Sequence, residues 1–195
     1  MQEIEICVDK RIELIGILLR LSNHKNSYPN LVLNIKNYPY LDDVYLHFSP
    51  HKNHRAVMLL NEILIKGNSF AFDVPALLFL NLDGDYNFVG QDKEPFTDRL
   101  NKSKLVLEFL KEAKNFVNDT NFEEFYNSHV NVYEEEIQSF KNSVDISNIL
   151  PFLKKLKIDI SGKRFVVILI ATFYKGRIWL KFKRHYFLRN TKSLR

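Results

Sequence analysis

The chain opens with alternating apolar and polar residues. Residues 4–8 alternate in this way, which predicts a short edge strand. Asp9 then stands at an N-cap position, where its carboxylate can accept a backbone N–H. Behind it, one helical face repeats apolar residues as far as Leu21, which predicts a helix. The residues on that face are Ile12, Ile15, Leu18 and Leu19.

Most of the following sequence has the apolar period of helices, separated by residues that break them. The expected helices span residues 41–48, 53–65, 76–82, 98–118, 121–141 and 145–157. Pro50 stops the first and Gly67 ends the second, whereas Pro151 bends or splits the last. Glu123 or Glu124 can complete a capping box at the start of 121–141.

The pattern changes near Gly162. Phe165–Ile170 is a continuous apolar run with many β-branched residues, and Ile178–Phe182 alternates with basic residues, so both predict strands. The sequence therefore predicts a mainly α fold with a small β component (α+β). We expect a helical domain with a short N-terminal strand over residues 1–160, followed by a basic β-like tail over 161–195.

The composition is that of an ordinary globular protein, with 46% apolar and 26% charged residues. A single cysteine, Cys7, excludes an internal disulfide and a cysteine-based zinc site. The first residues lack the basic and apolar regions of a signal peptide. The longest apolar run, Phe165–Tyr174, is shorter than the ~20 residues that a membrane helix needs. These features predict a cytoplasmic protein, and abundant Asn, Lys, Ile, Phe and Tyr indicate an AT-rich bacterial genome.

Charge is segregated along the chain. No acidic residue follows Asp159, while residues 160–195 contain ten basic residues. The first 159 residues contain the other 18 basic residues and all 23 acidic ones, so they carry a net charge of −5. The basic side chains considered for anion binding are Lys163, Arg164, Lys175, Arg177, Lys181, Lys183 and Arg184. With interleaved aromatic residues, they fit a segment that contacts nucleic acid or an anionic membrane. A shifted reading frame in AT-rich DNA would give the same composition.

Three histidines, His47, His51 and His54, have the spacing that zinc ligands on one helical face would need. Pro50 lies between them and should break that helix. No histidine belongs to an H-E-x-x-H motif, in which two histidines bind zinc and the glutamate acts as base. A polar helix junction is the favoured interpretation.

Acidic residues at 83, 85 and 94, with Asn87, match ligand positions of a calcium-binding EF-hand loop. That loop requires glycine at its sixth position, which is Phe88 here, and Pro95 follows immediately. The sequence therefore favours an acidic surface turn over a calcium site.

Three segments resemble a bacterial family of unknown function, domain of unknown function 4932. Residues 8–14, V-D-K-R-I-E-L, resemble the V-D-x-R-x-E-L-L stretch that opens the family. Residues 48–57 resemble its aromatic-x-P-Y-K-x-H-P-A-V segment, with His51 in place of the aromatic residue and Arg55 in place of proline. Residues 121–129 resemble its T-N-F-x-x-F-(Y/F)-x-x-H segment. The motif positions that this resemblance selects are Asp9, Arg11, Glu13, Lys52, His54, Phe122 and His129.

The resemblance implies the helical N-terminal region of a zincin-like protein. In that family the helical region leads into a strand, a glycine-rich stretch and a helix bearing H-E-x-x-H, so full-length relatives would be zinc-dependent hydrolases. Val166–Leu169 resembles the strand, but no H-E-x-x-H follows. The resemblance therefore assigns no catalytic residue, no metal ligand and no zinc to this chain, which is not expected to be an enzyme. Arg11, Glu13, Lys52 and His54 would be structural or would line a groove.

Two functions follow as hypotheses. The first is a catalytically inactive N-terminal fragment of a zinc-metallopeptidase-like protein, with a tail that is truncated or frame-shifted. The alternative is a small binding protein whose basic aromatic tail contacts nucleic acid or an anionic membrane.

Overall fold

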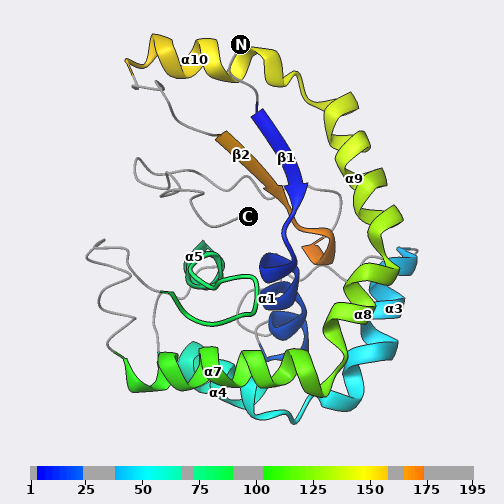
Figure 1. Ribbon diagram of the computed structural model, residues 1–195, viewed down its shortest axis with the longest axis vertical. Coiled ribbons are helices and arrows are strands. Elements are labelled where there is room, and N and C mark those ends of the chain that lie inside the picture. The colour runs from blue at the N-terminus through cyan, green and yellow to red at the C-terminus, as the bar shows by residue number, and fades with distance from the viewer. Residues whose placement is uncertain (1–3, 24–37, 67–72, 90–102, 158–164, 174–195) are drawn as a thin grey trace.

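Helices that pack around a small parallel sheet make up the structure, and they confirm the mainly α, α+β class (Figure 1). The computed structural model describes residues 4–23, 38–66, 73–89, 103–157 and 165–173. The α-helices are α1 (Lys10–Leu21), α3 (Pro39–Phe48), α4 (Arg55–Lys66), α5 (Asp73–Leu80), α7 (Lys104–Asp119), α8 (Phe122–Ser128), α9 (Val130–Ser143) and α10 (Ile149–Lys155). Short 3-10 helices are η1 (Ser49–His51), η2 (Ile146–Asn148) and η3 (Ala171–Phe173).

Two strands from distant parts of the chain pair in parallel. Strand β1 (Ile4–Val8) lies beside β2 (Phe165–Leu169), with Ile4 opposite Phe165 and Val8 opposite Leu169. Both strands were predicted, but the pattern of neither one showed its partner. The division of the chain at residue 160 stays a prediction. The described part of the tail nevertheless shares one core with the helices, through its buried residues Ile168, Leu169, Ile170 and Ala171.

Helix α1 is the central helix of the body. The Asp9 carboxylate caps it by accepting the Arg11 backbone N–H at 2.9 Å, as the sequence predicted. Its residues 12–19 are all buried, including those outside the predicted apolar face, because α3, α4, α5 and η3 pack around it.

An aromatic cluster joins three helices at one end of the body. The Phe48 ring of α3 lies 5.8 Å from the Phe116 ring of α7, 6.3 Å from Phe122 and 4.8 Å from Phe125, both on α8, between ring centroids. Phe48, Phe116 and Phe122 have no solvent-exposed surface. Such large buried rings make a major contribution to burial of apolar area.

The predicted helix 121–141 is two helices, because the chain turns at His129 between α8 and α9. The predicted capping box was also wrong. Asn121 adopts a left-handed backbone conformation with φ 51°, and its side chain caps no N–H. The Thr120 hydroxyl instead donates to the Phe116 carbonyl at 2.7 Å. This sharp turn directs Phe122 into the core.

Proline positions explain two other boundaries. Pro50 lies within η1, directly after α3 ends. Pro151 occupies the first turn of α10, where the N–H it lacks would have no helical partner, and so η2 and α10 replace one longer helix. The predicted strand Ile178–Phe182 and the predicted boundary near Gly162 lie outside the described residues. No helix in the described part of the chain is both long enough and apolar enough to cross a membrane.

Candidate functional site

A carboxyl group without solvent contact lies at the centre of the body. Glu13 of α1 has 0% of its surface exposed. Its Oε1 accepts the Ala171 backbone N–H at 2.5 Å, and its Oε2 accepts the Thr172 N–H at 3.2 Å. The Tyr40 hydroxyl donates to Oε2 at 3.0 Å. Three donors from two separate segments therefore converge on one buried side chain.

A second tyrosine extends this network. The hydroxyls of Tyr40 and Tyr133 lie 3.1 Å apart, so one donates to the other. Their rings meet edge to face at 5.7 Å between centroids, and both residues are buried. The network thus links α1, α3 and α9 through hydrogen-bonded side chains.

Arg20 holds the other side of the same peptide segment. It lies seven residues after Glu13, on the same face of α1, and its Nε donates to the Thr172 carbonyl. The Thr172 N–H therefore donates to the Glu13 carboxyl, and the Thr172 C=O accepts from the Arg20 guanidinium. We call Glu13, Arg20 and the Ala171–Thr172 backbone the α1 clamp.

Burial sets the electrostatics of the clamp. Desolvation raises the pKa of Glu13 from 4.5 to about 7, although hydrogen bonds from Tyr40, Ala171 and Thr172 oppose the shift. Desolvation likewise lowers the pKa of Arg20. The Thr172 hydroxyl lies near enough to Glu13 to favour its ionised form. It makes no hydrogen bond of good geometry to any described residue. A carboxyl in this setting can exchange a proton near neutral pH.

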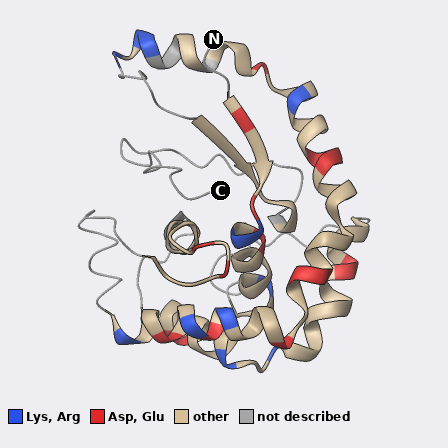
Figure 2. Ribbon diagram, viewed as in Figure 1, with Lys and Arg blue, Asp and Glu red and all other residues tan. Residues whose placement is uncertain are grey.

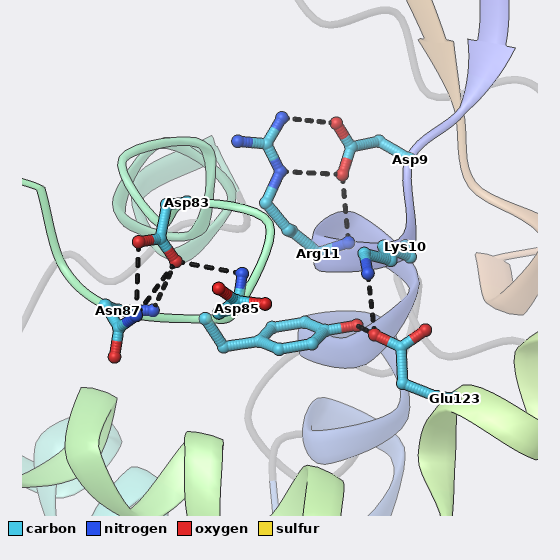
Figure 3. Close-up of polar contacts among 8 residues, drawn as sticks. Asp9, Lys10, Arg11, Asp83, Asp85, Asn87 and Glu123 are labelled. Carbon is cyan, nitrogen blue, oxygen red and sulfur yellow. Dashed lines mark hydrogen bonds and ion pairs between the residues drawn. The ribbon is translucent and has the colours of Figure 1, made fainter. Parts of the chain in front are cut away.

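The Asp9–Arg11 pair fixes the junction between β1 and α1 (Figure 3). Arg11 donates to both carboxylate oxygens of Asp9, through Nε at 2.9 Å and Nη2 at 2.5 Å. Its Nη1 donates to the carbonyls of Leu80 and Leu82, at 3.2 Å and 2.7 Å. The side-chain hydrogen bond with Asp9 raises the pKa of Arg11. The guanidinium therefore ties the start of α1 to the end of α5.

The predicted acidic turn is present at residues 83–87 (Figure 3). The Asp83 carboxylate accepts the backbone N–H groups of Asp85 at 2.9 Å and Asn87 at 2.8 Å, and these bonds help to lower its pKa. Its oxygens thus hold the turn together, as Asp side chains commonly do. Glu94, the twelfth position of the calcium-loop pattern, lies outside the described residues.

Tyr86 connects this turn to α1 and α8. It has a left-handed φ of 59°, and its buried ring lies 5.0 Å from the Lys10 ammonium. Its hydroxyl donates to Glu123 Oε1 at 2.7 Å, and Lys10 binds the same oxygen at 2.6 Å. A shallow groove runs along these residues, beside Lys114 and Asn118. Lys10 and Glu123 pair with one another here, and the Lys114 ammonium donates to the Asn87 side-chain oxygen at 2.6 Å.

The three histidines do not converge. His47 Nε2 binds the Thr120 carbonyl at 2.7 Å. His54 accepts the Ala56 N–H at the start of α4, and its Nε2 lies 3.2 Å from the Asp119 carboxylate. Among the described residues, no group of three His, Cys, Asp or Glu side chains could hold a metal ion. The family resemblance implies zinc only for full-length relatives and assigns no ligand to this chain.

The remaining family-motif positions lie apart from one another. Phe122 belongs to the core, and Lys52 is exposed on the link between η1 and α4. His129 Nδ1 binds the Phe125 carbonyl at 2.8 Å, and its Nε2 lies 3.4 Å from Asp43 of α3. Of the motif residues, only Asp9 and Arg11 bind one another. The motif marks several separate tertiary contacts.

The predicted anion-binding side chains of the tail, from Lys163 to Arg184, lie outside the described residues. In the described part of the chain, acidic residues recur along α8 and α9, whereas acidic and basic residues mix on α4 and α7 (Figure 2).

Sequence reasoning missed the donors to Glu13, namely Tyr40, Ala171 and Thr172. It also missed Tyr133, which binds Tyr40, and Arg20, which binds the Thr172 carbonyl. One signal was available, because Glu13 stands between Ile12 and Leu14 in a helix with few other polar residues. That position indicates burial, but it does not identify which donors lie opposite.

No protein-family model, curated protein or solved structure matches this chain. The family resemblance therefore stays a hypothesis that rests on the three sequence segments.

Proposed function

We propose that this chain is a catalytically inactive N-terminal portion of a zinc-metallopeptidase-like protein, in which the family motif serves as scaffold. The observation that carries the proposal is the role of the D-K-R-I-E segment. Asp9 and Arg11 bind α1 to the end of α5, and Glu13 binds the backbone directly after β2.

The position of the clamp supports this proposal. In the family that the chain resembles, the strand that matches β2 leads toward the zinc-binding helix. A buried acid that holds Ala171 and Thr172 would set the direction in which the chain leaves that strand. The motif would then be required for folding, whether or not the metal-binding segment follows it.

The test is metal content and hydrolysis on the full chain. We expect purified protein, dialysed after incubation with zinc chloride, to retain far less than one zinc per chain by mass spectrometry of the metal. We also expect no cleavage of fluorescent casein. A His54→Ala variant should give the same two results, because His54 binds Asp119 and Ala56.

Stoichiometric zinc together with chelator-sensitive cleavage would overturn the proposal. Loss of that zinc in His54→Ala would move the site to the histidines. A zinc peptidase assayed in parallel controls for the substrate.

The second candidate is the basic tail as a binding segment for nucleic acid or anionic membrane. Its support is the run of ten basic residues without an acid after Asp159. The structure changes how it must be tested, because Ile168–Ala171 belong to the core. Truncation after residue 174 removes eight of the ten basic residues and keeps β2. It should abolish salt-sensitive binding to single-stranded DNA or to vesicles with anionic lipid. Binding that survives the truncation would exclude the tail.

A further inference from the structure

Burial and hydrogen bonding act in opposite directions on the ionisation of Glu13. Glu13 is fully buried, and among the described residues no lysine, arginine or histidine forms a direct ion pair with it. A buried charge without such a pair is strongly disfavoured. Two backbone N–H groups and the Tyr40 hydroxyl nevertheless point at the carboxyl, and these donors favour the charged form.

Both protonation states can satisfy the network. When Glu13 is ionised, Tyr40 donates to it and Tyr133 can donate to Tyr40. When Glu13 is protonated, its O–H can donate to Tyr40, which then donates to Tyr133. The 3.1 Å contact between the two hydroxyls permits either direction. The cost of ionisation therefore falls on desolvation, which is relieved only if water reaches the carboxyl.

The segment that excludes this water contains a buried hydroxyl group, that of Thr172. Ala171 and Thr172 are buried against Glu13, and the Thr172 hydroxyl is buried without a hydrogen-bond partner among the described residues. A polar group left unpaired in this way would recover a hydrogen bond if the segment opened.

We propose that Glu13 and the Ala171–Thr172 backbone form a pH-sensitive latch, closed while Glu13 carries a proton and released from α1 as the carboxyl ionises. This inference does not depend on the proposed function. The raised pKa of Glu13, about 7, places the change near neutral pH.

Among the described residues, the groups that interact with the charge of Glu13 do not titrate in this range. Those that interact with its charge are Arg20 of α1, Tyr38 and Tyr40 at the start of α3, Tyr126 of α8 and Tyr133 of α9. Burial raises the pKa of each of these tyrosines above its ordinary value of 10, and an arginine stays charged throughout. The proton would therefore be exchanged at Glu13 itself.

Amide hydrogen exchange on the full chain tests the latch. The reporters are the amides of Ala171 and Thr172, and Ala113 in the interior of α7 reports global opening. After correction for base catalysis, we expect protection at the two reporters to fall on the order of tenfold per pH unit between pH 5 and pH 7, then to level off. Protection at Ala113 should fall much less.

Two variants assign the effect to the carboxyl. Glu13→Gln cannot ionise, so its protection should be independent of pH. Tyr40→Phe removes a donor to the carboxylate and should move the levelling point to higher pH, whereas Tyr45→Phe, exposed on the same helix, should not move it. Wild-type protection that is flat, that falls in parallel at Ala113, or that keeps its slope in Glu13→Gln would overturn the latch. If Glu13→Gln fails to fold, an unmoved levelling point in Tyr40→Phe would overturn it as well.

Discussion

Glu13 and Arg20, two helical turns apart on α1, bind the N–H and the C=O of the same residue, Thr172. Helical geometry places residues seven apart on one face, so a single helix presents an acceptor and a donor to the short 3-10 helix η3. The relationship joins residues more than 150 positions apart in the sequence, and it makes the segment after β2 depend on α1.

Replacing Glu13 by Gln should change how stability depends on pH. The native pKa of Glu13 lies above its ordinary value of 4.5, so between about 4.5 and 7 the native state binds a proton that the unfolded state has released. The free energy of unfolding of the wild type should therefore fall as pH rises through this window, by up to about 3 kcal/mol. Urea unfolding at pH 5 and pH 8 measures it. Glu13→Gln should lose this decrease, while Glu124→Gln, exposed on α8, should keep it.

Arg11→Lys should destabilise the protein by about 1–3 kcal/mol, because an ammonium cannot bind the Asp9 carboxylate bidentately and also reach two carbonyls. The matched control is Arg55→Lys, since Arg55 binds Glu108 on the exposed surface. Chemical denaturation of both variants measures the difference. Equal losses would show that the contacts of Arg11 with Leu80 and Leu82 contribute little.

Asp83→Ala should loosen the turn between Leu82 and Phe88. The substitution removes the acceptor of two backbone N–H groups, at a cost of about 0.5–1.5 kcal/mol. Asp85→Ala is the control, because the Asp85 side chain does not hold the turn. Hydrogen exchange at the Asn87 amide should increase in the first variant only. If added calcium increases protection of the Asn87 amide in the wild type but not in Asp83→Ala, the result would instead support a cation site.

Phe48→Ala should be the most disruptive of these changes, with a loss of about 3–5 kcal/mol, because it leaves a cavity among Phe116, Phe122 and Phe125. Leu46→Ala on the same helix removes a side chain that is 77% exposed, and it should cost little. Thermal unfolding should separate the two. A small effect of Phe48→Ala would mean that the neighbouring rings close the cavity.

Local pattern located most of the described elements. The alternation in residues 4–8 and the Asp9 cap predicted β1 and the start of α1, and both agree with the structure. The prediction failed at Asn121 and His129, where one expected helix became two. The left-handed Asn121 lies before α8, and the backbone leaves the helical conformation at His129, with φ −109° and ψ 16°. Phe122 and Phe125 enter the core between these two points, and apolar period alone does not show such turns.

Partners across the chain were beyond the reach of pattern. The resemblance selected Asp9, Arg11 and Glu13 without showing what they contact. Asp9 binds the nearby backbone of Arg11, the Arg11 side chain binds backbone at the end of α5, and Glu13 binds backbone after β2. Backbone N–H and C=O groups are the same at every residue, so no side-chain motif in the sequence marks them as partners.

The sequence by itself determined the helical class, the two strands and the helix start at Asp9, because these depend on residues close together along the chain. Only the tertiary structure decided that β1 pairs with β2, that Glu13 is fully buried, that Tyr40 binds Glu13, and that Arg20 binds the segment that Glu13 holds. Burial and proton affinity depend on what packs around a side chain, and those neighbours come from parts of the chain that local period does not connect.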